Sequence, residues 1–234
     1  MAFPFFYISN YYGEQLLALD EETSRHVLQV LRMKNSEKLN LTDGKGHLLI
    51  CEIVETGKKT CTVRVLTTSN QQPLTRNVSI AISLLKNSSR FEWFLEKATE
   101  IGLREIIPLI CDRTVKEKFR HDRMNAICIS AMLQSQQCWL PKLYEPVEFA
   151  KAISASSAKQ KFIAFCAEAK DKKNLSTFPS YNPSTIFIGP EGDFSSKEIE
   201  LALQNAFQPV SLGETRLRTE TAGVVAATLM MNAL

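Results

Sequence analysis

The chain has 234 residues, of which 44% are apolar and 23% are charged. These fractions are those of an ordinary folded protein, and they exclude an intrinsically disordered or collagen-like chain. The 28 Lys and Arg residues only slightly outnumber the 25 Asp and Glu residues, so any basic face must be narrow. Glycine is scarce, with nine residues where average usage would give roughly sixteen, and the last fifth of the chain holds several of them.

Six cysteines and three histidines are scattered along the chain without the close spacing of metal ligands, so no metal site is expected. The cysteines lie in apolar stretches, and we expect them to be reduced, buried thiols of a cytoplasmic protein. No stretch approaches the roughly 18 apolar residues that a membrane-spanning helix needs. The apolar start of the chain also lacks the basic residues of a signal peptide.

Residues 1–70 are expected to form a small β-rich unit, because short alternating runs are separated there by turn residues. Asp43-Gly44 between two such runs is a strong hairpin signal. The polar residues 69–76, with one proline, are typical of a linker. We expect strands at 4–9, 37–42, 47–55 and 60–68, and a short helix at 20–32 with Val27, Val30 and Leu31 on one apolar face.

From residue 77 onward, strands and helices alternate, which predicts an α/β domain on a mostly parallel sheet. Two helices begin with sequences typical of a capping box, Ser89 with Glu92 and Ser195 with Glu198. We expect strands at 78–85, 105–110, 161–166, 184–189 and 209–212, and helices at 88–102 (closed by Gly102), 120–137, 195–207 and 219–234.

Two loops are the best candidates for a ligand site, because each follows an expected strand and opens an expected helix, at 186–198 and 211–223. Ligands of parallel sheets bind at the carboxyl ends of the strands, and Gly189 and Gly192 let the backbone approach a ligand closely. Taken singly, the first loop could be a plain turn, and Glu220 could simply face a helix dipole. The signatures of common dinucleotide, phosphate-binding and hydrolase loops are missing.

The segments "GPEGDF" (189–194) and "LGETRLRTETAG" (212–223) resemble the two C-terminal signatures of the ribosomal RNA small subunit methyltransferase E family, in the SPOUT class of knotted methyltransferases. The resemblance continues in the right order through 25–46, 84–115 and 131–141, and so covers most of the chain.

This resemblance implies a PUA-like RNA-binding barrel over residues 1–70 and a SPOUT domain over residues 77–234, whose trefoil knot binds S-adenosylmethionine. It implies methylation of N3 of one uridine in 16S rRNA, near the decoding centre of the small ribosomal subunit. It also implies a homodimer that needs neither a metal nor a membrane.

The same resemblance implies roles for individual residues. The expected cofactor-binding residues are Gly189, Pro190, Glu191, Gly192, Leu212, Gly213, Leu217, Arg218, Thr219 and Glu220. The expected RNA-binding residues are Arg25, Arg32, Lys34, Lys86, Arg90 and Arg113. The basic segment 113–123 either contacts RNA as well or is simply the solvent-exposed start of a helix.

Uracil N3 must lose its proton as it attacks a methyl group, and negative charge then develops near O2 and O4. Arg218 and Arg113 are the candidates for a cation that stabilises this charge, and Glu191 and Glu220 are weaker candidates for the base.

The chain departs from the family pattern at a few positions. Asp193 stands where the family often has glycine, Leu133 where it often has Glu, and Gln137 where it often has Arg. Three other functions stay open: a SPOUT enzyme acting on another RNA, a non-catalytic RNA-binding or assembly factor, and an α/β enzyme with a different nucleotide cofactor.

Overall fold

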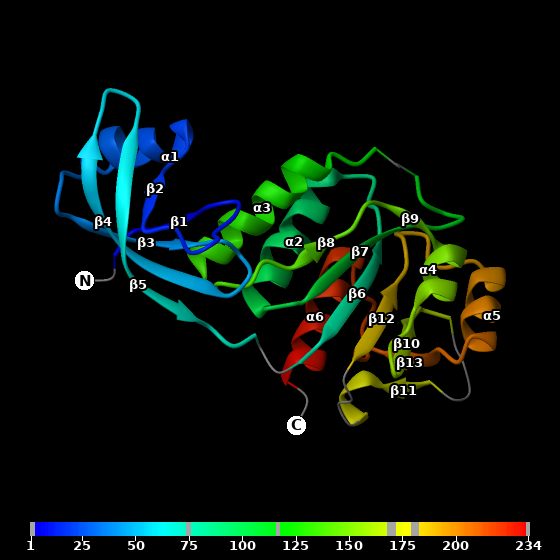
Figure 1. Ribbon diagram of the computed structural model, residues 1–234. Helices are drawn as coiled ribbons and strands as arrows, with labels where there is room; N and C mark the ends of the chain where they lie inside the picture. The colour runs from blue at the N-terminus through cyan, green and yellow to red at the C-terminus, as the bar shows by residue number, and fades with distance from the viewer. Residues whose placement is uncertain (1–2, 74–75, 116–117, 168–171, 179–182, 233–234) are drawn as a thin grey trace. The chain divides into compact units, whose positions relative to one another are not determined.

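The computed structural model describes residues 3–73, 76–115, 118–167, 172–178 and 183–232 (Figure 1). The chain forms two compact units, Met1–Pro73 with Met132–Leu140, and Leu74–Ala131 with Pro141–Leu234. Parts of three predictions lie outside the described residues, namely 74–75 of the expected linker, 116–117 of the basic segment and 233–234 of the last helix.

The first unit is built on a five-stranded sheet in the order β1-β3-β4-β5-β2. β1 runs parallel to β3 and the other neighbours are antiparallel. The hairpin predicted at Asp43-Gly44 is confirmed, because β3 and β4 pair across this turn and Gly44 has a φ of 69°. The strands are β1 Phe5–Tyr7, β2 Leu16–Ala18, β3 Lys38–Thr42, β4 His47–Thr56 and β5 Cys61–Asn70.

The predicted apolar face of the helix at 20–32 is wrong in its second half. Val27 is fully buried, but Val30 and Leu31 are 66% and 42% exposed. The α-helix α1 ends at Arg25 and gives way to one π-helical turn, His26–Val30, in which Leu31 N donates to His26 O at 2.9 Å. A π turn holds more residues than an α turn, so the helical spacing no longer places these side chains with Val27.

Residues 132–140 join the first unit, which the sequence did not indicate. Gly46 N donates to Cys138 O at 2.8 Å, and Leu140 N donates to Gly44 O at 2.9 Å. The indole N–H of Trp139 donates to the Gln71 carbonyl at 3.0 Å. Segment 132–140 is therefore fixed by main-chain hydrogen bonds to the β3–β4 turn and by a side-chain hydrogen bond to Gln71.

The second unit is the predicted α/β domain, and its described strands are all parallel, in the order β11-β13-β10-β12-β6-β7-β8 with β9 also paired to β7. Its strands are β6 Val78–Ser83, β7 Glu105–Ile110, β8 Lys142–Leu143, β9 Val147–Glu148, β10 Gln160–Ala164, β11 Lys173–Asn174, β12 Ser184–Ile188 and β13 Gln208–Ser211. Its helices are α2 Ser88–Ile101, α3 His121–Gln134 (whose last residues, from Met132, belong to the first unit), α4 Phe149–Ala155, α5 Ser196–Gln204 and α6 Thr219–Asn232, with a short 3₁₀ helix at Leu175–Thr177. None of the described helices is long and apolar enough to cross a membrane.

Helices cover both faces of this sheet. On one face, α4 and α5 pack on an apolar core that includes Ala81, Ile163 and Phe187. The opposite face carries α6, which packs against α2, β6 and β12 (Figure 1). Because all strands run the same way, the loops after β7, β10, β12 and β13 meet at one edge of the sheet.

One of the two predicted capping boxes is confirmed. Glu198 N donates to Ser195 Oγ at 3.3 Å, and Ser195 N donates to Glu198 Oε2 at 2.8 Å. The box predicted at Ser89 and Glu92 is wrong, because α2 is capped by Asn87, whose Oδ1 accepts from Ser89 N at 3.0 Å. Asn is at least as good an N-cap as Ser, and the cap lies two residues before the predicted one, while α2 begins at Ser88 as predicted.

Replacing Asn87 with Ala is expected to lower the free energy of unfolding by about 1 kcal/mol, because the amide N–H at the start of α2 loses its acceptor. The matched variant Ser89→Ala should change it by less than about 0.5 kcal/mol. Urea denaturation of both variants checks this, and a larger loss from Ser89→Ala than from Asn87→Ala would contradict the observed cap.

Candidate functional site

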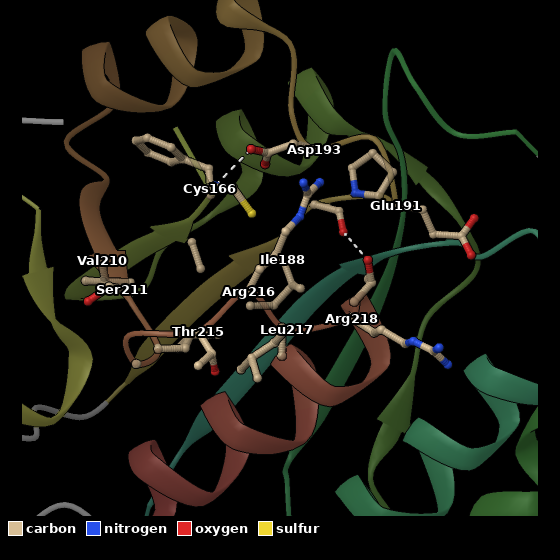
Figure 2. Close-up of a pocket in the computed structure, with 18 of the residues that line it drawn as sticks. Cys166, Ile188, Glu191, Asp193, Val210, Ser211, Thr215, Arg216, Leu217 and Arg218 are labelled. Carbon is tan, nitrogen blue, oxygen red and sulfur yellow. Dashed lines mark hydrogen bonds between the residues drawn. The ribbon is translucent and has the colours of Figure 1, made fainter. Parts of the chain in front are cut away.

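A cavity of about 780 Å³ lies in the second unit, where the loops after β10, β12 and β13 meet (Figure 2). Its walls come from 164–166, from 188–191 with Asp193, and from 210–219, together with Arg90, Lys172 and Ala222. This volume is within the range of about 300–1,000 Å³ that is usual for small-molecule sites. The two loops singled out from the sequence therefore share one cavity.

Most of the predicted cofactor-binding residues line this cavity. They are Gly189, Pro190, Glu191, Leu212, Gly213, Leu217, Arg218 and Thr219. The two exceptions are Gly192, whose carbonyl accepts from Arg113, and Glu220, which is 7% exposed.

The loop 189–194 is held on three sides by hydrogen bonds. Thr219 Oγ1 donates to the Gly189 carbonyl at 3.1 Å, which joins the two signature loops (dashed in Figure 2). Arg113 Nη1 donates to the Gly192 carbonyl at 2.7 Å. A side chain at Gly189 would bring its Cβ within 3.1 Å of the Phe194 ring, so glycine lets the loop lie against this ring.

Asp193 supplies the third attachment and explains how the chain does without the family's glycine. Its φ of 66° is left-handed, a conformation that Asp tolerates better than most residues. Its Oδ2 accepts from Cys166 N at 2.8 Å and its Oδ1 accepts from Phe194 N at 2.9 Å. Asp193 thus ties the loop after β12 to the loop after β10, while the cap of α5 is left to Ser195.

Arg90, at the cavity wall, connects two of the predicted site carboxylates, Glu191 and Glu220. Its Nη1 lies 3.3 Å from Glu191 Oε1, and its Nε lies 3.7 Å from Glu220 Oε1. The other oxygen of Glu220 is buried and has no hydrogen-bond partner among the described residues. Glu220 lies behind Arg90 and holds this guanidinium, whereas Glu191 borders the cavity itself.

The other predicted site residues are not among those that line the cavity. Arg113 is not among its lining residues and donates to the carbonyls of Gly192 and Phe194 instead. Lys86 is exposed beside the start of α2. The exposed residues Arg25, Arg32 and Lys34 belong to the first unit.

The two remaining departures from the family pattern lie in the first unit. Leu133 is half-buried near the end of α3. The Gln137 side-chain amide donates to Ser135 Oγ at 3.0 Å.

Sequence reasoning missed one wall of the cavity, which is formed by Phe165, Cys166 and Lys172. It also left out Arg216, whose side chain crosses the cavity toward Asp193 in Figure 2. The carboxyl end of the apolar run at 161–166 was the available signal, because it had to lie at the same sheet edge as the other two loops.

Cys166 is exposed, so the expectation of buried thiols is wrong at this position, while the other five cysteines are free and buried. Burial raises the pKa of Cys51 and of Cys111 to about 12 and that of Cys128 to about 11. Among the described residues, His, Cys, Asp and Glu form no cluster of three that could hold a metal ion.

Comparisons with known proteins agree with this geometry. Residues 70–231 match the family model of an RNA methyltransferase domain, and residues 19–66 match that of an RNA methyltransferase PUA domain. The ribosomal RNA small subunit methyltransferase E of Synechocystis sp. is 32% identical over 208 residues, which are 86% of this chain and 68% of that protein.

Two crystal structures are similar along nearly the whole chain. A Porphyromonas gingivalis protein described as a "probable rRNA-methyltransferase" is 37% identical with a TM-score of 0.90, over 96% of this chain and 95% of that one. The ribosomal RNA small subunit methyltransferase E of Neisseria gonorrhoeae, bound to S-adenosyl methionine, is 27% identical with a TM-score of 0.87, over 97% and 96% of the two chains. With both signature loops in one cavity and both family models matched, the chain belongs to the ribosomal RNA small subunit methyltransferase E family.

Proposed function

We propose that this protein uses S-adenosylmethionine to methylate N3 of one uridine of 16S rRNA, near the decoding centre of the small ribosomal subunit. The observation on which the proposal chiefly rests is the shared cavity, because both signature loops of an rRNA methyltransferase family form its walls. The Neisseria gonorrhoeae relative, which is bound to S-adenosyl methionine, supports the choice of cofactor.

The cavity residues fit this cofactor. Apolar side chains for a purine ring come from Phe165, Ile188 and Leu217, and the main chain of 188–191 and 211–219 offers hydrogen-bonding groups for polar substituents. At Gly189, which borders the cavity, a Cβ would lie only 3.1 Å from the Phe194 ring, so the loop packs tightly on that side. When bound, S-adenosylmethionine supplies an electrophilic methyl group on its sulfonium.

The residues around the cavity then have two tasks in the transfer. The methyl acceptor must be held in line with the bond that breaks, and the charge that develops on uracil must be stabilised as N3 loses its proton. Arg218 is exposed at the cavity wall, which supports it as the cation that stabilises the charge near O2 or O4. Glu191 borders the cavity and Glu220 does not, so we assign to Glu191 the role of the base that removes the N3 proton.

The resemblance also supports a finer architecture, which belongs to the same proposal. The first unit would be a PUA-like barrel that contacts RNA through Arg25, Arg32 and Lys34. The second would contain a trefoil knot around the loops 189–194 and 212–218, and the enzyme would act as a homodimer in the cytoplasm.

The direct test of this function is nucleoside mass spectrometry of small-subunit rRNA from a strain that lacks the gene. Loss of 3-methyluridine, with recovery after complementation by the wild-type gene, is the expected result. Unchanged 3-methyluridine together with loss of another methylated nucleoside would assign the enzyme to another RNA site. Calorimetry that detects no binding of S-adenosylmethionine would favour a non-catalytic RNA-binding protein.

Occupancy of the cavity can be followed through Cys166, because it is the one exposed thiol among six cysteines. Under native conditions, a thiol reagent should modify Cys166 rapidly and leave the buried thiols unmodified. S-adenosylmethionine should slow this reaction at least tenfold, since Cys166 lines the cavity. The reaction rate is measured by absorbance with Ellman's reagent, and the variant Cys166→Ser identifies the signal. Equal rates with and without S-adenosylmethionine would contradict cofactor binding in this cavity.

A further inference from the structure

Segment 113–123 is rich in basic residues, and the fold uses the two arginines at its ends. Arg113 supports the loop at Gly192 through a hydrogen bond of 2.7 Å. Arg123 Nε and Nη2 donate to the two oxygens of Glu92 at 2.7 and 2.9 Å, and this pairing lowers the pKa of the Glu92 carboxyl. The charges of these two arginines are therefore engaged within the second unit.

Lys118 and Arg120, between these arginines, are in a different situation. Both are exposed, and neither side chain makes a hydrogen bond or ion pair with a described residue, although the Arg120 carbonyl accepts from Met124 N at 3.1 Å. Phe119 stands between them and packs edge-on against the rings of Phe91 and His121. Lys118 and Arg120, on either side of this anchored ring, line the same cavity.

These two cations meet at a second cavity of about 300 Å³, which we call the Lys118–Arg120 cavity. It is lined by Ser88, Glu92, Lys118, Arg120 and Met124. The single carboxylate in its wall, that of Glu92, is paired with Arg123 and is also attracted by Arg120. Lys118, Arg120 and Arg123 thus share one carboxylate, and positive charge is in excess there. Ser88 is the first residue of α2, and the positive end of this helix dipole adds to the same field.

We propose that the Lys118–Arg120 cavity binds a backbone phosphate of the RNA substrate. A phosphate group matches the two exposed cations that line this cavity better than a neutral ligand would. This assignment rests on the proposed function, which makes RNA the substrate.

The position of this cavity on α2 relates it to the cofactor site. Ser88 and Glu92 line the Lys118–Arg120 cavity, and Arg90, between them on the same helix, lines the cavity of 780 Å³. Residues two apart on a helix point to different sides, so the first two turns of α2 separate the two cavities. A phosphate held at Lys118 and Arg120 would place the RNA strand beside α2, with the neighbouring nucleotide directed toward Arg90.

The test compares two double variants that each remove two positive charges. Lys118→Gln with Arg120→Gln alters the proposed site. Lys142→Gln with Lys159→Gln is the control, because both lysines are exposed and lie at the amino ends of β8 and β10, the sheet edge opposite the cavities. The full-length proteins are titrated with unmethylated small-subunit rRNA at several salt concentrations, and Cys166 protection by S-adenosylmethionine is measured in parallel.

We expect the site variant to raise the Kd for RNA about tenfold and to reduce the slope of log affinity against log salt by about 1. The control should change both by much less, and Cys166 protection should be unchanged in both. Equal RNA affinities for the two double variants would overturn the phosphate site. A second result would also overturn the RNA-phosphate site: the site variant alone loses saturable binding of inorganic phosphate, but its affinity for RNA is unchanged. The cavity would then be a site for free phosphate.

The same data separate this inference from the proposed function. If the wild type transfers no methyl group to rRNA and the site variant still loses RNA affinity, the methyltransferase function fails and the phosphate site stands. If the wild type methylates rRNA and the site variant behaves as the control does, the phosphate site fails alone. A wild type that does not bind RNA would remove both.

Discussion

The variant Arg218→Ala is expected to fold normally and to lose about 10²–10³-fold in kcat for rRNA methylation. Uracil becomes negatively charged as N3 attacks, and one preorganised donor facing such a charge is worth a factor of this size. Arg218 is exposed at the cavity wall, and its carbonyl accepts from Ala222 N at 2.7 Å in the first turn of α6. Alanine keeps this main-chain bond, so the loss should fall on the chemical step.

The measurement is single-turnover methyl transfer from radiolabelled S-adenosylmethionine to unmethylated small-subunit rRNA. Arg218→Lys is the matched variant, since it keeps the charge without the planar guanidinium, and it should retain more activity than Arg218→Ala. Protection of Cys166 by S-adenosylmethionine should persist in both variants if Arg218 acts on uracil. Full transfer activity of Arg218→Ala would remove Arg218 from the mechanism. If S-adenosylmethionine no longer protects Cys166 in this variant, but the single-turnover rate at saturating cofactor is normal, Arg218 is a cofactor-binding residue only.

Much of the site was predictable because its parts are local in sequence. A strand, a glycine and a capped helix follow one another at 184–204, and each part can be recognised from neighbouring residues. The wall formed by Phe165 and Cys166 was not predictable in this way. It depends on β10 lying between β12 and β13, and strand order is set by packing between segments that are distant in sequence.

Long-range contacts also explain two of the local predictions that failed. Glu92 fits a capping box by its spacing from Ser89, but Arg123, 31 residues later, offers it a two-pronged ion pair, and Asn87 takes the cap. Residues 132–140 read as the end of one helix and its tail, yet they bond to the β3–β4 turn of the first unit. In both cases a partner far along the chain outweighs the local pattern.

Gly223 lies in α6, at a position where the structure leaves no room for a side chain. A Cβ at this position would lie 2.6 Å from Phe94 Cε2 and 2.9 Å from Ile82 Cδ1. Phe94 and Ile82 are fully buried, so neither can move aside into solvent. Glycine therefore lets α6 lie close against α2 and β6.

Replacing Gly223 with Val is expected to lower the free energy of unfolding by roughly 3 kcal/mol, at the upper end of the usual cost of overpacking a core. Gly223→Ala should cost about 1 kcal/mol, because a better helix propensity offsets part of the clash. Thermal unfolding followed by circular dichroism checks the order, with the midpoint of the Val variant falling by about 6–12 °C. A Val variant as stable as the wild type would show that α6 can shift away from α2 at little cost.

The clash can be assigned to its partner by shortening Phe94. Phe94→Leu alone leaves a gap and lowers the free energy of unfolding. Combined with Gly223→Ala, it should relieve the clash, so the double variant should lose less stability than the sum of the two single variants. Phe94 lies one helical turn after Arg90 on α2, and Arg90 lines the cavity, so a displaced α2 should also weaken protection of Cys166 by S-adenosylmethionine. Strictly additive effects of the two substitutions would mean that Phe94 does not limit the approach of α6.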